Sequence, residues 1–469
     1  MGLFAIGLDV YWQQFPGLRE RLDQYTKAIS ARLLKRGVEL VDFGMVDSSE
    51  LARQAAHNFC RADIDLLLLH VSTYALSSTV LPIVRRVKVP LLILNLSPEP
   101  AIDYERFNRL NDRTAMTGEW LSYCQACPLP EMANVLRRCH VPFFAITGTM
   151  HEEDGAWAEL GEWLDAASVA GILANSTLGL MGHYYGGMLD VYCDLTQLCS
   201  AFGTHIEQLE VDELTAIRRE ISRSAIEEKI AEFRMAFEID ESCPAVELTR
   251  AAQTASALDK FVDRHRLDFL AYYHKGTGIV ENEDVMSSII LGTSLLTAAG
   301  VPVAGEYEVK NAHAMKIMDA FGCGGSFTEF YAVDYLEDVV LMGHDGPGHV
   351  RIANGNPKVR PLSAYHGKVG RGLSIEMSVK HGPVTLLSVV EGDNGNLKLL
   401  TAQGDSVPGP TLEIGNTNSR YRFSIGARRF IREWSCTGPA HHCAIGVGHI
   451  ASKIQKLAAL LGIGHVQVC

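Results

Sequence analysis

The first third of the chain alternates short, continuously apolar runs with amphipathic segments. The apolar runs Leu3–Leu8, Ile64–Val71 and Leu91–Leu96 predict strands, and residues 18–33 place their apolar side chains on one helical face. Strands that are apolar on both faces are typical of a parallel sheet covered by helices. Residues 1–166 are therefore predicted to form an N-terminal α/β domain with a doubly wound, Rossmann-like or flavodoxin-like sheet.

A looser version of the same alternation continues through residues 167–320. Leu178–Met181, His205–Leu209, Leu267–Tyr273 and Val301–Gly305 are the apolar runs that predict strands here. This stretch is predicted to be a central α/β domain of the same doubly wound type.

The pattern changes after residue 320. Ser374–Lys380 and Val384–Val390 flank a His381-Gly382 turn, which predicts a β-hairpin, and Ile450–Leu461 has the periodicity of a closing helix. Residues 321–469 are predicted to form a mostly antiparallel, barrel-like β domain that ends in this helix.

Charge and hydropathy exclude several classes of function. The chain has 42 Lys and Arg against 55 Asp and Glu, a formal net charge of −13, which disfavours binding to nucleic acid or to an anionic membrane surface. The longest apolar runs fall far short of the roughly 20 residues that a spanning helix needs. The N-terminus has no basic region before its apolar residues, and the odd number of 11 scattered cysteines fits free thiols. We expect a cytoplasmic protein.

The sequence lacks the common cofactor and hydrolase motifs. The glycine-rich segment Gly322–Ser326 follows a predicted helix, whereas a dinucleotide fingerprint follows a strand and opens a helix. We therefore expect no nucleotide cofactor. Neither a G-x-S-x-G elbow nor an H-E-x-x-H motif occurs.

Acids and histidines do stand at the ends of predicted elements. Glu306 directly follows a predicted strand, Glu329 lies among aromatic residues, His344 ends an apolar run, and His442 is the second of a histidine pair. Two carboxylates and two imidazoles would make a site suited to Mn²⁺, Co²⁺ or a similar divalent ion. Each residue alone also has an ordinary structural interpretation, and only the fold could bring them together.

Four segments around these residues resemble the L-arabinose isomerase and L-fucose isomerase superfamily in their order and approximate spacing. They are Gly305–Ala312, Gly325–Tyr331, Leu341–His344 and Gly438–His442. The sequence of two α/β domains and a β-rich domain extends the likeness over nearly the whole chain.

The resemblance implies a metal-dependent isomerase that interconverts a free aldose and its 2-ketose through an enediol or enediolate. The metal is usually Mn²⁺, with Co²⁺ or Mg²⁺ as alternatives. Glu306, Glu329, His344 and His442 would hold it, and Glu306 and Glu329 would share the acid–base work. His349 competes with His344, because the spacing from Glu329 is one or two residues short. The resemblance also implies a homo-oligomer, a trimer or hexamer, with the active site at the subunit interface.

Other residues are candidates for contact with a sugar substrate. The glycine-rich segment 182–190 contributes His183, Tyr184 and Asp190, whose side chains suit hydroxyl groups, and Lys275 follows another predicted strand. Each of these could equally belong to a plain loop. Arabinose isomerases carry a histidine where this chain has Met116, and the segment 345–349, with His349, also differs from them. The identity of the sugar therefore stays open.

Two other functions fit the same residues. One is a metal-dependent sugar epimerase, and the other is a non-catalytic sugar-binding or regulatory protein on the same fold. Metal content separates the last from the enzymes, because a pure binding protein has no need of paired acids beside a metal.

Overall fold

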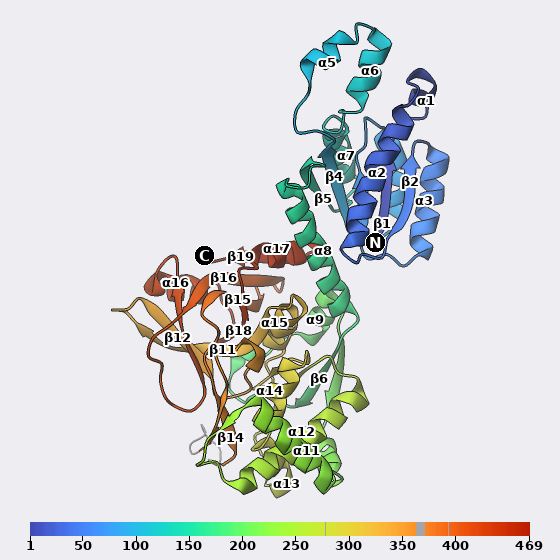
Figure 1. The fold of residues 1–469 in the computed structure, drawn as a ribbon. Helices are drawn as coiled ribbons and strands as arrows, with labels where there is room; N and C mark the ends of the chain where they lie inside the picture. Colours follow the sequence, from blue (N-terminus) through green and yellow to red (C-terminus); the bar gives the residue numbers. More distant parts are fainter. Residues whose placement is uncertain (277, 363–370, 393) are drawn as a thin grey trace. The chain divides into compact units, whose positions relative to one another are not determined.

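The computed structural model describes residues 1–276, 278–362, 371–392 and 394–469. The chain divides into two compact units, Met1–Ala167 and Ser168–Cys469, which are coloured along the sequence in Figure 1. Each unit is described by itself.

The first unit is built on a parallel five-stranded sheet of order β2-β1-β3-β4-β5. Neighbouring residues of β1 face two different cores. Phe4 and Ile6 pack with residues of α3, α4 and α7, whereas Ala5 packs with residues of α2. Because successive side chains of a strand point to opposite faces, helices cover both faces of this sheet. The strands are β1 (Gly2–Ile6), β2 (Val41–Val46), β3 (Leu67–His70), β4 (Leu91–Ser97) and β5 (Phe143–Thr149).

Aspartate and serine side chains cap the N-termini of several helices of this unit. Ser48 accepts a hydrogen bond from the Leu51 amide at the start of α3, and Asp112 accepts one from Ala115 at the start of α6. The helices are α1 (Val10–Gln14), α2 (Leu18–Lys35), α3 (Ser49–Arg61), α4 (Ser77–Arg86), α5 (Tyr104–Arg109), α6 (Arg113–Leu121), α7 (Pro128–Arg138) and α8 (Gly155–Ala174), which runs on into the second unit.

The second unit begins with a parallel four-stranded sheet of order β10-β9-β6-β7. Its strands are β6 (Thr177–Gly182), β7 (His205–Leu209), β9 (Phe269–Tyr273) and β10 (Val303–Ala304). The helices that follow them are α9 (Leu195–Phe202), α10 (Val211–Arg219), α11 (Arg223–Ala236), α12 (Ala245–His265), α13 (Val280–Met286), α14 (Ile290–Ala298) and α15 (Val309–Ala320). Both parallel sheets confirm the predicted α/β class.

Most of the remaining strands of the second unit form an antiparallel barrel, as predicted. Six strands follow one another in the order β15-β18-β11-β12-β17-β16, and pairing of β15 with β16 closes the circle. They are β11 (Gly324–Asp334), β12 (Val339–His344), β15 (Gly382–Glu391), β16 (Leu397–Val407), β17 (Thr417–Phe423) and β18 (His442–Val447), accompanied by α16 (Ala427–Cys436), α17 (Ala451–Leu461) and β19 (Gly464–Gln467).

The predicted hairpin between Ser374–Lys380 and Val384–Val390 is wrong. Both edges of β15 are already occupied, one by β16 along its whole length and the other by β18, so no edge is left for the preceding strand. That strand, β14 (Leu373–Glu376), instead pairs with β13 (Lys358–Pro361), and β13 pairs with the short β8 (Glu238–Ile239). A separate three-stranded sheet results.

Helix α15 joins the parallel sheet to the barrel. It follows β10 and packs against β9, β11, β15 and β18, and Figure 1 shows it beside β11, β15 and β18. Its first ten residues, 309–318, are all buried. The two buried lysines of this helix find backbone partners: the ammonium of Lys310 donates to the carbonyl of Asp190, and that of Lys316 to the carbonyl of Gly300.

Two expectations about the environment of the protein can be compared with the structure. Within the described ranges, no helix combines the length and the apolar character that a membrane crossing requires. All eleven cysteines are free thiols.

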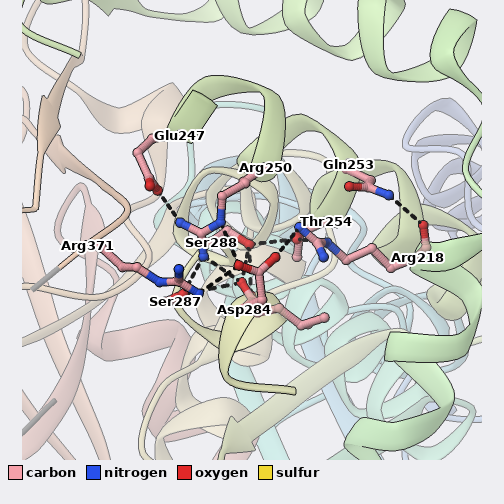
Figure 2. Close-up of polar contacts among 10 residues, drawn as sticks. Arg218, Glu247, Arg250, Gln253, Thr254, Asp284, Ser287, Ser288 and Arg371 are labelled. Atoms are coloured by element: carbon pink, nitrogen blue, oxygen red, sulfur yellow. Dashed lines mark hydrogen bonds and ion pairs between the residues drawn. The ribbon is translucent and has the colours of Figure 1, made fainter. Parts of the chain in front are cut away.

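Asp284 on α13 anchors a cluster of arginines, drawn in Figure 2. Its carboxylate lies 2.7 Å from Arg218 of α10, 2.8 Å from Arg250 of α12 and 2.7 Å from Arg371, which stands two residues before β14. Arg250 also donates to the hydroxyl of Ser287. One acid therefore ties three separate parts of the second unit together.

Replacing Asp284 should destabilise this unit. Asp284→Asn leaves three guanidinium groups around a neutral amide, two of them largely buried, and removing one partner of a buried ion pair costs about 3 kcal/mol. The matched control is Glu281→Gln on the same helix, whose pair with Arg219 is exposed and contributes about 0–1 kcal/mol. Denaturant unfolding of both variants measures the difference. Equal, small losses would contradict the anchoring role.

Candidate active site

Three barrel strands and one strand of the parallel sheet deliver the acids and histidines to a single place. Glu306 is separated from β10 by Gly305, His344 ends β12, and His442 begins β18. Glu329 lies in the middle of β11, directly opposite His442 on one side and Gly343 on the other. The register of these strands therefore places residues that are far apart in the sequence side by side.

The turn that presents Glu306 is strained. Glu306 and Tyr307 both have positive φ angles, 56° and 59°. Residues other than glycine adopt such angles at a cost of about 1–2 kcal/mol each. Tyr307 holds the turn: its amide donates to the carbonyl of Tyr272 at 2.9 Å, and its hydroxyl donates to Gln208 at 2.8 Å. Backbone strain of this kind is concentrated at functional sites.

Five side chains form two overlapping groups that could hold a metal ion. One consists of Glu306, His441 and His442, and the other of Glu329, His344 and His442; within each group the ligand atoms lie within 4.8 Å of one another. His442 belongs to both. Four of these five residues were predicted as ligands from the sequence, and His441 was not.

The spacing of these atoms suits a divalent ion. Nε2 of His442 lies 3.4 Å from Oε2 of Glu306, and Nε2 of His344 lies 4.0 Å from Oε1 of Glu306. With bonds of about 2.1 Å, two ligand atoms on one octahedral ion are about 3.0 to 4.2 Å apart. Carboxylate oxygen and imidazole nitrogen together suit Mn²⁺ and related ions.

His442 supplies the clearest sign that a ligand belongs here. The ring is buried, and neither Nδ1 nor Nε2 makes a hydrogen bond to any residue that the structure describes. Buried polar atoms are nearly always satisfied, because an unmade hydrogen bond costs about 1–3 kcal/mol. Burial and the neighbouring His441 hold the pKa of His442 well below its usual value, so the ring is neutral and able to bind a metal.

His344 is less well prepared to bind. The amide of Gly346 donates to its Nδ1 at 2.8 Å, which places the proton of the neutral ring on Nε2, the atom nearer Glu306. Burial lowers the pKa of His344 to about 3. For Nε2 to bind a metal, the proton must move to Nδ1, where Oδ1 of Asp345 lies 3.6 Å away.

His441 faces Glu306 and Glu329, and a hydrogen bond to Asp190 holds its ring in place. Its Nδ1 lies 2.6 Å from Oδ2 of Asp190, which also accepts the amide of His441 at 3.0 Å. Its Nε2 lies 4.0 Å from Glu306 and 3.9 Å from Glu329. Burial works to lower the pKa of His441, but the hydrogen bond to Asp190 and the three carboxylates raise it above its usual value.

Lys310 fixes the loop that carries Asp190. Its ammonium donates to the backbone carbonyls of Asp190 at 2.6 Å and Tyr192 at 3.4 Å. Asp190 lies in the short 3₁₀ helix Leu189–Val191, so the buried lysine sets the position of the acid that orients His441. Asp190 was predicted to contact substrate, and in the structure its carboxylate accepts hydrogen bonds from the amide and the ring of His441.

Glu308 lies behind His442. It is fully buried, and burial raises its pKa to about 8. Its Oε2 lies 3.6 Å from Nδ1 of His442. Phe327 completes the surroundings of the histidines, with its ring centroid 4.5 Å from that of His442 and 4.4 Å from that of His344. One aromatic ring and one buried acid thus lie against the two histidines on their inner side.

The remaining predicted substrate contacts have varied surroundings. Nδ1 of His183 donates to the carbonyl of Tyr184, and its Nε2 accepts the amide of Lys275, so this ring links the loops after β6 and β9. The hydroxyl of Tyr184 contacts the thiol of Cys193. The side chain of Lys275 is exposed.

Two other predicted residues are not members of the metal-ligand groups. His349 is buried, and its amide donates to Ser326; among the described residues it belongs to neither ligand group. Met116 lies on α6 in the first unit. The structure thus brings His344 rather than His349 to the acids.

No protein-family model and no curated protein sequence matches this chain. The geometry of the cluster therefore carries the functional argument.

Two residues of the site were not expected from the sequence in their observed roles. His441 stands next to a predicted ligand, and the tandem of two histidines was the only local signal for it. Glu308 stands two residues after Glu306 and looks like an ordinary acid of a loop. Its burial depends on the contact of α15 with β18, which no local pattern reveals.

Metal binding should stabilise the protein through this cluster. Mn²⁺ at a concentration 100 times its dissociation constant should add about 2.7 kcal/mol to the free energy of unfolding. Replacing His442 with Gln should abolish that increment, because His442 belongs to both ligand groups. Thermal unfolding with Mn²⁺ and with a chelator measures the effect. The control is His449→Gln, a histidine outside both groups that bonds to the carbonyl of Gly404 and should keep the full increment.

Proposed function

We propose that the chain is a divalent-metal-dependent aldose–ketose isomerase of the L-arabinose isomerase and L-fucose isomerase type. The observation that carries the proposal is the pairing of Glu306 and Glu329 around one histidine, with Nε2 of His441 about equally far from both carboxylates. Two acids that share a site with potential metal ligands suit a reaction that removes a proton at one carbon and returns it at the next.

The residues present fit the proposed metal in that two groups of potential ligands share His442, one with Glu306 and the other with Glu329. Glu306, Glu329 and His442 would hold it, with His344 as a further ligand. When bound, a divalent ion polarises the sugar carbonyl and stabilises negative charge on the adjacent oxygens. Mn²⁺ is the proposed ion, with Co²⁺ or Mg²⁺ as alternatives, and no nucleotide cofactor is required.

The chain's own groups handle the protons. One carboxylate of the Glu306 and Glu329 pair takes the proton from C2 of an aldose, and an enediol forms as C1 and C2 share a double bond. The other acid starts protonated and gives its proton to C1, while a proton passes from O2 to O1, which completes the 2-ketose and leaves the two acids with exchanged protonation states. The order in which the two acids act follows from the face on which the sugar binds.

His441 is suited to moving the proton between the two sugar oxygens. Its Nδ1–H donates to Asp190, which fixes the ring and leaves Nε2 facing Glu306 and Glu329. A histidine oriented by a carboxylate in this way is a common arrangement for proton transfer at neutral pH. Lys310 and Asp190 act through His441 and are positioning residues.

The proposed substrate is a free sugar, and the proposed setting is the cytoplasm. A homo-oligomer, a trimer or hexamer, with the active site at a subunit interface is part of the same proposal. A sugar epimerase would use the same two acids at a single carbon. A sugar-binding protein without catalysis would have no need of buried, unbonded imidazole nitrogens such as those of His442.

Replacing either acid should stop the reaction but leave the fold. Glu306→Gln and Glu329→Gln should each lower kcat about 10²- to 10⁴-fold, the typical contribution of a general acid or base. Conversion of a panel of free aldoses and ketoses by the Mn²⁺-loaded protein is followed by chromatography, with solvent deuterium at C1 or C2 as the record of proton transfer. The control is Glu337→Gln, an exposed acid of the β11–β12 turn.

Each outcome of this experiment is informative. Conversion of one aldose into its 2-ketose that requires metal and both acids supports the isomerase. Deuterium at C2 with a change of configuration and no ketose would favour the epimerase instead. Full activity in either Gln variant would overturn the assignment of the two acids.

A further inference from the structure

Glu308 and His442 form a buried pair behind the proposed metal ligands. The side chains of both are 0% exposed, and Oε2 of Glu308 lies 3.6 Å from Nδ1 of His442. Neither carboxylate oxygen and neither ring nitrogen makes a hydrogen bond to any residue in the described part of the chain. Two fully buried polar groups therefore face each other without being satisfied.

Stability of the protein does not explain this arrangement. A buried carboxylate without hydrogen bonds is costly, and an amide or an apolar side chain of similar volume would fold at lower cost. Lys310 is close enough to act electrostatically on Glu308, but its ammonium donates to the carbonyls of Asp190 and Tyr192. The role of Glu308 therefore lies in its effect on His442.

The geometry indicates what that is. Nδ1 of His442 faces Glu308, and Nε2 faces Glu306 at 3.4 Å. A ring with its proton on Nδ1 donates toward Glu308 and leaves the lone pair of Nε2 directed into the group of acids. The other tautomer would direct an N–H into that group and could not bind a metal there.

We propose that Glu308 is a positioning residue for the metal site: it accepts the Nδ1–H of His442 and so holds Nε2 of that ring ready to bind. Outer carboxylates of this kind fix the tautomer and orientation of metal-binding histidines and raise their affinity about 10- to 100-fold. The inference rests on the proposed metal site, but it does not depend on which sugar or which reaction the site serves.

The first step of the test measures metal affinity without any sugar. Protein freed of metal by a chelator is titrated with Mn²⁺ and Co²⁺ in a calorimeter, for the parent chain, Glu308→Gln and Glu308→Ala. We expect the dissociation constant to rise about 10-fold for Gln, which keeps an oxygen acceptor, and about 100-fold for Ala. If the Ala variant fails to fold, the Gln variant alone decides.

The second step measures stability without metal. Because Gln replaces an unsatisfied buried acid with a neutral amide of the same shape, metal-free Glu308→Gln should unfold at the same temperature as the parent chain or at a higher one. A residue with only a structural role would give the opposite pattern, lower stability and unchanged affinity. The matched control is Asp319→Asn, a largely buried acid at the other end of α15 that pairs with Lys316, and it should leave metal affinity unchanged.

The outcomes separate this inference from the proposed function. If the parent chain binds metal and Glu308→Gln binds it equally well, the role of Glu308 is refuted and the metal site remains. If the parent chain binds neither ion, the metal site is refuted, and the proposed isomerase and the role of Glu308 fail with it. Weakened binding with undiminished stability supports the role.

Discussion

The register between strands β18, β11 and β12 is the constraint on which the candidate site depends. It sets His442 opposite Glu329 and sets Glu329 opposite Gly343, next to His344. A slip of one residue would turn Glu329 to the other face of its strand. Closure of the barrel prevents such a slip. Gly343 fixes the register further, because a Cβ atom at this position would lie 1.7 Å from the carbonyl oxygen of Thr417 on β17, so no residue other than glycine fits here.

The parallel sheet contributes Glu306, and the turn that presents this residue has a strained backbone. Glu306 reaches the barrel strands only because the turn after β10 takes two left-handed residues, which Tyr307 then holds through Tyr272 and Gln208. Helix α15 starts from this turn and is buried between the sheet and the barrel, so Glu308 at its beginning is carried beneath His442. Glu306 from the parallel sheet thus meets Glu329, His344 and His442 from the strands of the barrel. The buried ring nitrogens of His442 cost free energy without hydrogen bonds, and a bound ligand would satisfy them.

Local patterns in the sequence predicted the type of each secondary-structure element better than they predicted which elements contact one another. Runs that are apolar on both faces identified the parallel strands, because such strands are covered by helices on both sides. The hairpin before β15 was wrong, since the competing edge partner β18 lies about sixty residues further along the chain and leaves no local trace. The four expected ligands came from a resemblance in the order of four segments rather than from periodicity. The pairing of Asp190 with His441 spans 251 residues, and the burial of Glu308 depends on tertiary packing, so neither could be derived from the sequence.

The central claim is that Glu306, Glu329 and His442 share one divalent ion. Anomalous diffraction from crystals of the Mn²⁺-loaded protein, recorded on both sides of the manganese absorption edge, tests it most directly. The account predicts one strong anomalous peak bonded to carboxylate oxygens of Glu306 and Glu329 and to Nε2 of His442. No manganese peak among these residues, or a peak elsewhere in the chain with this cluster bonded only to itself, would contradict it.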